Sequence, residues 1–265
     1  MPERHPYLDG PHPRAYAHRG WHIGDLAGCE NTLVAFARAV DEGFGYLELD
    51  VHATADGVAV VHHDRTLDRT TDASGPIGAL VAAELAGVRV AGREPVPTLA
   101  EVLTVLPDTR ITIELKTMSA VQPVLAVLDR LDAWHRVCLG SSVDGHLAAA
   151  RRGAGPRLLT SLGMRSAAAL RTRAWVDALP GRLAALPAPP FRGRLAQLPH
   201  RHGPLRVVDP GLVGTARRAG MEVHVWTIDE PEEMTELLAM GVDGLMSDRA
   251  DLLRDLLTTH DRWPG

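Results

Sequence analysis

Short apolar runs of strand length alternate with amphipathic helical patterns along the whole chain. The apolar runs cover residues 14–18, 46–51, 110–115, 136–139, 157–160, 195–198, 222–227 and 244–247. Helix-capping residues are expected at Thr98, with Glu101 three positions on, and at Gly43, Gly153, Gly220 and Gly241. Eight strand–helix units predict an α/β fold of the (β/α)8 TIM-barrel class. An open doubly wound sheet is the alternative, but no Gly-x-Gly-x-x-Gly turn supports a nucleotide-binding version of it.

Two stretches interrupt this rhythm. Residues 58–97 begin with a strand-like run, become polar and turn-rich, and are too few to form a domain of their own. Residues 179–193 are rich in Pro, Gly and Ala and are expected to form a loop. We therefore expect a single TIM-barrel domain over residues 1–265, with a short insertion at about 58–97 after the second strand.

Charge and composition exclude several classes of function. The net charge is −5 without a basic stripe, so nucleic acid is not an expected partner. No apolar segment is long enough to span a bilayer, and residues 1–13 lack the apolar core of a signal peptide, so we expect a cytoplasmic protein. Cys29 and Cys138 are far apart and are expected to be reduced thiols. The oligomeric state is left open.

Acidic side chains follow the pattern of the second and third predicted strands. Glu48 and Asp50 share one face of their strand, as do Glu114 and Lys116, because strand side chains alternate between faces. The carboxyl ends of barrel strands meet at one mouth. Three buried acids would cost several kcal/mol each without compensation, which a divalent cation supplies. Oxygen ligands favour Mg²⁺ or Ca²⁺, with Mn²⁺ as a further candidate.

Histidines and basic residues accompany these acids. His18 closes the first strand beside Arg19, and His63 precedes Asp64; His62 is a rival to His63, because a shift of one residue reverses the facing of a strand side chain. Lys116 is the only lysine among 28 basic residues, which indicates a need for a compact ammonium.

Other candidates have plainer interpretations. His22, His200 and His202 are expected to have no chemical role among the thirteen histidines. The segment of residues 30–32 (Glu, Asn, Thr) either caps the first helix or places that helix terminus towards an anion. Trp226 ends the seventh strand on its inward face, either as a core residue or in contact with substrate.

The ordered set of segments resembles the glycerophosphodiester phosphodiesterase family. The segments are Ala-His-Arg-Gly at 17–20, Glu-Asn-Thr-Leu at 30–33, Leu-Glu-Leu-Asp-Val at 47–51, Thr-Ala-Asp-Gly at 54–57, Val-Val-His-His-Asp at 60–64, Val-Pro-Thr-Leu-Ala-Glu at 96–101, Ile-Glu-Leu-Lys at 113–116, Val-Trp-Thr at 225–227 and Gly-Val-Asp-Gly at 241–244. Leu67, Arg69 and Thr70 also match. Departures include Cys29, where the family commonly has proline.

This resemblance implies a metal-dependent TIM barrel that cleaves small glycerophosphodiesters into an alcohol and sn-glycerol 3-phosphate. Carried over by position, the cation ligands would be Glu48, Asp50 and Glu114. His18 and His63 would be the acid/base pair, which favours His63 over His62, and the substrate and its phosphate would contact Arg19, Lys116 and Trp226. Which histidine is the acid, and whether water or a glycerol hydroxyl attacks, stays open.

Three alternative functions are compared with this one. A lysophospholipase D or sphingomyelinase D-like activity would need an apolar trough, to which Trp21, Ile23 and Leu26 are candidates to contribute. A metal-dependent sugar isomerase or an aldolase is less favoured, because the acids beside Lys116 would keep its amine protonated and unable to form a Schiff base. A non-catalytic binding module would not need the acid/base set.

Overall fold

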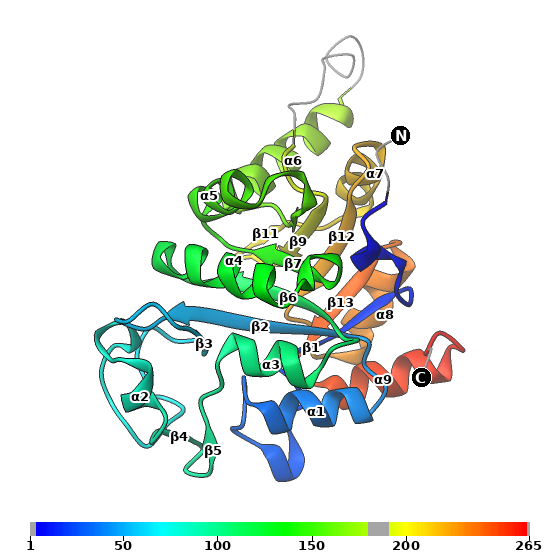
Figure 1. Cartoon of the computed structure of the whole chain (residues 1–265). Coiled ribbons are helices and arrows are strands. Elements are labelled where there is room, and N and C mark those ends of the chain that lie inside the picture. Colours follow the sequence, from blue (N-terminus) through cyan, green and yellow to red (C-terminus); the bar gives the residue numbers. More distant parts are fainter. Residues whose placement is uncertain (1–3, 180–190, 264–265) are drawn as a thin grey trace.

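Eight parallel strands form a nearly closed barrel in the computed structural model, which describes residues 4–179 and 191–263 (Figure 1). The barrel strands are β1 (Arg14–His18), β2 (Tyr46–Ala53), β6 (Arg110–Leu115), β7 (Val137–Gly140), β8 (Leu159–Thr160), β9 (Leu195–Pro199), β12 (Glu222–Trp226) and β13 (Gly244–Ser247). Their order is β8-β7-β6-β2-β1-β13-β12-β9, and a parallel bridge from Ser161 to Leu195 brings the two outer strands together. The predicted TIM barrel is confirmed.

Helices surround the barrel and cover the outward side chains of the strands. They are α1 (Leu33–Asp41), α3 (Leu99–Val105), α4 (Val121–Arg130), α5 (Asp144–Ala154), α6 (Met164–Asp177), α7 (Pro210–Arg218), α8 (Pro231–Ala239) and α9 (Ala250–Thr259). Leu47, Leu49 and Val51 of β2 are fully buried in the main apolar core. Glu48 and Asp50 therefore take the opposite face of β2, inside the barrel.

Two local predictions needed correction. Gly153 does not end its helix: α5 continues to Ala154, and Gly155, with φ of +71°, follows it. A Cβ on Gly153 would lie 2.6 Å from Leu125 Cδ1, so this glycine serves the packing of α5 on α4. The strand predicted at residues 157–160 is reduced to Leu159–Thr160, because Gly155–Arg157 forms a 3₁₀ turn. Most of the predicted loop at 179–193 lies outside the described residues.

The insertion after β2 packs beside the carboxyl end of that strand, where Figure 1 shows it next to the β2 arrowhead. It contains β3 (Ala59–Val61), which pairs antiparallel with β2, then η3 (Ile77–Ala79), α2 (Ala82–Leu85) and the small ribbon of β4 (Arg89–Val90) and β5 (Glu94–Pro95). A small apolar cluster that includes Leu67, Ile77 and Val90 holds it together. The insertion thus adds a wall to the mouth of the barrel.

The amino-terminal end of the barrel is closed by η1 (Pro6–Asp9). The hydroxyl of Tyr7 lies 2.7 Å from that of Thr112 in β6. The buried guanidinium of Arg14 donates to the carbonyls of Leu8 and Pro11, at 2.6 Å each, and to Glu222 at 3.0 and 3.1 Å. These bonds seal the end of the barrel opposite the mouth.

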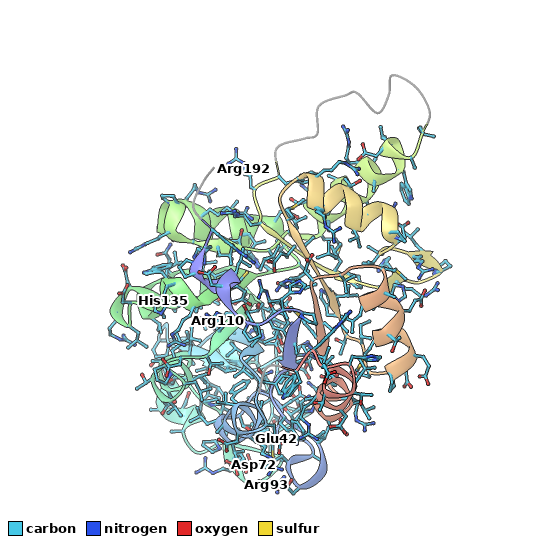
Figure 2. The ribbon with its side chains drawn as sticks, turned by 90° about the vertical axis from the view of Figure 1, so that its right-hand side faces the viewer. Glu42, Asp72, Arg93, Arg110, His135 and Arg192 are labelled. Carbon is cyan, nitrogen blue, oxygen red and sulfur yellow. The ribbon has the colours of Figure 1, made fainter. Side chains whose placement is uncertain are left out.

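A small hollow of about 210 Å³ lies at this closed end, and Arg110 and His135, which help to line it, are both labelled in Figure 2. The remaining short elements are η2 (Gly24–Leu26), η4 (Met118–Ala120), η5 (Ala133–Arg136), η6 (Gly155–Arg157) and the hairpin of β10 (Arg201–His202) and β11 (Leu205–Arg206). Among the described residues, no helix combines the length and the apolar character needed to cross a bilayer.

Candidate active site

Three carboxylates meet inside the mouth of the barrel. Glu48, Asp50 and Glu114 each offer an oxygen, and these oxygens lie within 4.8 Å of one another. The pairing of β2 with β6 sets Asp50 directly beside Glu114. Glu48 is 4% exposed and Asp50 1%, and Glu48 Oε2 is buried without a hydrogen-bond partner. This all-oxygen donor set fits a hard divalent cation such as Mg²⁺ or Ca²⁺.

Lys116 lies against the same carboxylates. Its Nζ is 3.2 Å from Asp50 Oδ1 and 3.5 Å from Glu114 Oε2. Although burial opposes it, the two carboxylates raise the pKa of Lys116, so the amine is a cation. Burial and the charges of Asp50 and Glu114 raise the pKa of Glu48. Burial would raise the pKa of Asp50 too, but Lys116 and Arg19 outweigh it and lower that pKa.

His18 stands on one side of this cluster. Its Nε2 lies 3.6 Å from Glu48 Oε2, and its Nδ1 lies 2.6 Å from Oδ1 of Asp248, just after β13. The Nε2 of His22 lies 3.2 Å from the same Asp248 oxygen. Burial alone would raise the pKa of Asp248, but hydrogen bonds from His18 and His22 outweigh it and lower that pKa. An ionised carboxylate only accepts hydrogen bonds, so His18 carries a proton on Nδ1.

His63 belongs to the insertion and is held in a similar way. Its Nδ1 lies 2.5 Å from Asp64 Oδ1, and Arg69 Nε donates to Asp64 Oδ2 at 2.6 Å. The hydrogen bond from Arg69 keeps the pKa of Asp64 low. His62 is buried, and its Nε2 lies 3.2 Å from the carbonyl of Thr66, a contact within the insertion. The structure therefore gives the two neighbouring histidines different surroundings.

Arg19 links the two sides of the mouth. Its Nη1 donates to Glu30 at 3.1 Å, its Nε lies 3.4 Å from Asp50 Oδ2, and Arg69 also binds Glu30, at 2.7 Å. Asn31 holds Asp50 through two hydrogen bonds, from its Nδ2 to Asp50 Oδ2 at 2.9 Å and from the Asp50 amide to its Oδ1 at 3.3 Å. The contacts of Glu30 and Asn31 go beyond helix capping.

Thr32 fills the capping role in this segment. Its Oγ1 accepts a hydrogen bond from the amide of Ala35, at the start of α1. Trp226, the last residue of β12, is 42% exposed and lies at the mouth rather than in the core.

Sequence reasoning missed Asp248 and gave His22 no role. A visible signal existed for Asp248, since a carboxylate directly after a predicted strand lies at the mouth.

His22 also lines an open groove of about 580 Å³ with Trp21, Ile23, Arg38, Arg249 and others. Trp21 is buried, so the groove offers only part of the apolar trough that a lysophospholipid would need.

A sequence profile of the glycerophosphoryl diester phosphodiesterase family matches residues 18–252. The chain belongs to this family. It is therefore a phosphoric diester hydrolase with glycerophosphodiester phosphodiesterase activity. The Mycobacterium tuberculosis protein named probable glycerophosphodiester phosphodiesterase 2 is 40% identical over 257 residues, which make up 95% of this chain and 93% of the relative. The resemblance inferred from the sequence segments is confirmed.

Solved structures of this phosphodiesterase family share the barrel. A putative glycerophosphoryl diester phosphodiesterase from Silicibacter pomeroyi superposes with a TM-score of 0.78 at 26% identity, over 97% of this chain and 99% of the other. A phosphodiesterase of Oleispira antarctica, in complex with the product sn-glycerol-3-phosphate, gives a TM-score of 0.73 at 23% identity, over 96% and 99%. The second likeness supports the fold.

Proposed function

We propose that this phosphodiesterase hydrolyses small glycerophosphodiesters to an alcohol and sn-glycerol 3-phosphate, with a divalent cation and with His18 and His63 as its acid/base pair. One arrangement carries the proposal: a three-carboxylate cluster with two histidines beside it, each bound through Nδ1 to its own aspartate. The product complex of the Oleispira antarctica relative supports the choice of glycerol phosphate. We further propose that residues 1–265 form one barrel domain with its insertion.

The phosphate would be held by charges of two kinds. Glu48, Asp50 and Glu114 would bind Mg²⁺ or Ca²⁺, with Mn²⁺ as a further candidate, and the cation would offset negative charge on the phosphate. Arg19 and Lys116 supply fixed positive charge beside the carboxylates. Arg19 suits two phosphate oxygens at once, while Lys116 acts as a point charge. Trp226, exposed at the mouth, would contact the organic part of the substrate.

Each histidine would move one proton. Asp248 and Asp64 bind the Nδ1 atoms, so the Nε2 atoms remain to exchange protons with the attacking oxygen and with the leaving alcohol. This division of roles requires that both imidazole rings contact the substrate, each at a different oxygen atom. His62 has no part in it, because its Nε2 is engaged with the Thr66 carbonyl.

The Schiff-base alternative is disfavoured by Lys116. Burial alone would lower the pKa of Lys116, but its ion pairs with Asp50 and Glu114 outweigh burial and raise that pKa. The amine therefore stays protonated, whereas a Schiff base forms only from a neutral amine.

A substrate panel tests the proposal. The protein would be incubated with Mg²⁺ or Ca²⁺ and with glycerophosphocholine, glycerophosphoethanolamine, glycerophosphoglycerol, a lysophosphatidylcholine and a phosphomonoester. We expect sn-glycerol 3-phosphate from the glycerophosphodiesters and no phosphate from the monoester. Turnover of lysophosphatidylcholine alone would assign the lysophospholipase D activity instead.

A further inference from the structure

Large apolar side chains are exposed at the mouth, on the half of the barrel away from the histidines. Five of them, which we call the apolar rim, follow the carboxyl ends of consecutive barrel strands or end such a strand: Met118 after β6, Val143 after β7, Met164 after β8, Leu205 after β9 and Trp226 at the end of β12. Elsewhere in the described chain, the exposed large apolar residues are Val81 in the insertion, Val105 and Trp175 on helices, and Leu179 just after α6.

The rim residues are neighbours in space as well as in strand order. Met118 Cε lies 4.0 Å, and Val143 Cγ1 3.8 Å, from the position that a Cβ on Gly145 would take. The amide of Met164 donates to the carbonyl of Ser142 at 2.9 Å, which ties the loops after β7 and β8 together. Trp226 pairs in register with Pro199, which leads into the hairpin that carries Leu205. These exposed apolar side chains can be buried only by contact with a binding partner, so the rim is a candidate interaction surface.

The charged residues around the apolar rim indicate the chemistry of that binding partner. Arg165 follows Met164, and Arg201 and His202 lie in the hairpin with Leu205; all three are exposed. The segments 117–119, 142–145, 163–165 and 200–206 contain a single acid, although the whole chain carries a net charge of −5. That acid, Asp144, is half-buried and accepts hydrogen bonds from the backbone amides of Arg165 and Ser166, at 2.9 and 3.3 Å. Glu230 and Glu232, at the start of α8, lie beyond Trp226. Apolar tips flanked by basic residues favour an interface that is apolar with anionic head groups.

We propose that the apolar rim docks this phosphodiesterase onto the surface of an anionic phospholipid bilayer, with the mouth of the barrel facing the lipid. Side chains such as Met164, 64% exposed, would enter the head-group region, and Arg165 and Arg201 would lie against lipid phosphates. Docking is peripheral and reversible, because a few side chains bury far less area than a spanning helix. The proposal does not depend on which phosphodiester is cleaved.

Vesicle co-sedimentation tests it with the full chain. The vesicles would be phosphatidylcholine alone or with about one third phosphatidylglycerol. We expect the protein to pellet with the anionic vesicles, and binding to fall as salt rises. The variant Met164→Asp/Leu205→Asp should lower the partition coefficient about 10-fold or more, since it replaces apolar groups by charges that the lipid repels. Turnover of soluble glycerophosphocholine should stay unchanged, as should the thermal melt.

Matched control variants test whether the loss of vesicle binding is specific to the apolar rim and to the arginines beside it. Val105→Asp changes an equally exposed apolar residue at the end of α3 and should leave vesicle binding intact. Arg165→Glu/Arg201→Glu should weaken binding to anionic vesicles, whereas Arg130→Glu, an exposed arginine at the end of α4, should not.

Three results would overturn the proposal: no binding to either vesicle, equal binding by the Met164→Asp/Leu205→Asp variant, or equal loss with Val105→Asp. A dimer in sedimentation velocity that the Met164→Asp/Leu205→Asp variant abolishes, without vesicle binding, would assign the rim to a second copy of the chain instead.

Discussion

The Nδ1 atom of His18 lies 2.6 Å from Oδ1 of Asp248, although the two residues are 230 positions apart in the chain. Burial alone would raise the pKa of Asp248, but hydrogen bonds from His18 and His22 outweigh burial and lower that pKa. The ionised carboxylate therefore accepts both hydrogen bonds. This fixes the ring of His18 with Nδ1 protonated and Nε2 towards Glu48, 3.6 Å away. Asp248 thus orients the proposed acid/base residue without itself belonging to the acidic cluster.

Replacing that carboxylate by an amide should disturb the ring and spare the fold. We expect Asp248→Asn to lower kcat about 10- to 100-fold, as loss of an orienting partner commonly does, with KM changed much less. Steady-state kinetics and a thermal melt would check this. Asp251→Asn is the control, since Asp251 pairs with Arg249 on the surface, at 2.7 Å. Equal losses in both variants would show that Asp248 has no orienting role.

The two neighbouring histidines of the insertion should differ sharply. We expect His18→Ala and His63→Ala each to lose roughly 10²–10⁴-fold in turnover, the usual scale for a general acid or base. His62→Ala should lose much less, because its Nε2 lies 3.2 Å from a carbonyl within the insertion. Rate measurements at saturating substrate decide the matter. An essential His62 beside a dispensable His63 would reverse the assignment.

The single lysine offers a test of charge shape. Lys116 Nζ lies 3.2 Å from Asp50 and 3.5 Å from Glu114, a distance range that suits a compact ammonium. The longer, planar guanidinium of Lys116→Arg should lower kcat/KM about 10-fold, with the melting temperature nearly unchanged. Lys116→Met is the companion variant and should lose more, since it removes the charge. Wild-type kinetics in Lys116→Arg would show that any cation suffices there.

Glu222, at the closed end of the barrel, should make the stability of the fold depend on pH in the acid range. Burial would raise the pKa of Glu222, but hydrogen bonds from His224 and Arg14 outweigh it and lower the pKa to about 2. A carboxyl group whose pKa is lowered by folding stabilises the fold at pH values above its pKa in the unfolded chain, which is near 4.5. This contribution to stability is lost as the pH falls towards 2. Glu222→Gln should therefore lower Tm at neutral pH, and the gap from wild type should narrow over that window. Glu236→Gln, at an exposed acid of α8, is the control; a gap independent of pH would contradict the linkage.

The barrel was predictable from the repeated strand–helix pattern, and the acidic cluster from the alternation of side chains along single strands. Glu48, Asp50 and Glu114 share the inward face, and pairing of β2 with β6 brings Asp50 beside Glu114. The contacts that Asp248 and Arg69 make at the site were harder to predict. Asp248 reaches His18 only because β13 pairs with β1, and Arg69 reaches Glu30 only because the insertion folds over the mouth. Such long-range contacts depend on tertiary packing that no local pattern contains.

The central claim is that the acidic cluster holds a divalent cation needed for cleavage, and chelation tests it most directly. The protein would be treated exhaustively with a chelator and assayed on glycerophosphocholine, with sn-glycerol 3-phosphate as the readout. Cation binding to the stripped protein would be measured by calorimetry in parallel, and again with Glu48→Gln/Asp50→Asn. We predict that turnover disappears, that Mg²⁺, Mn²⁺ or Ca²⁺ restores it, and that the double variant binds no cation. Full activity after complete chelation would contradict the account.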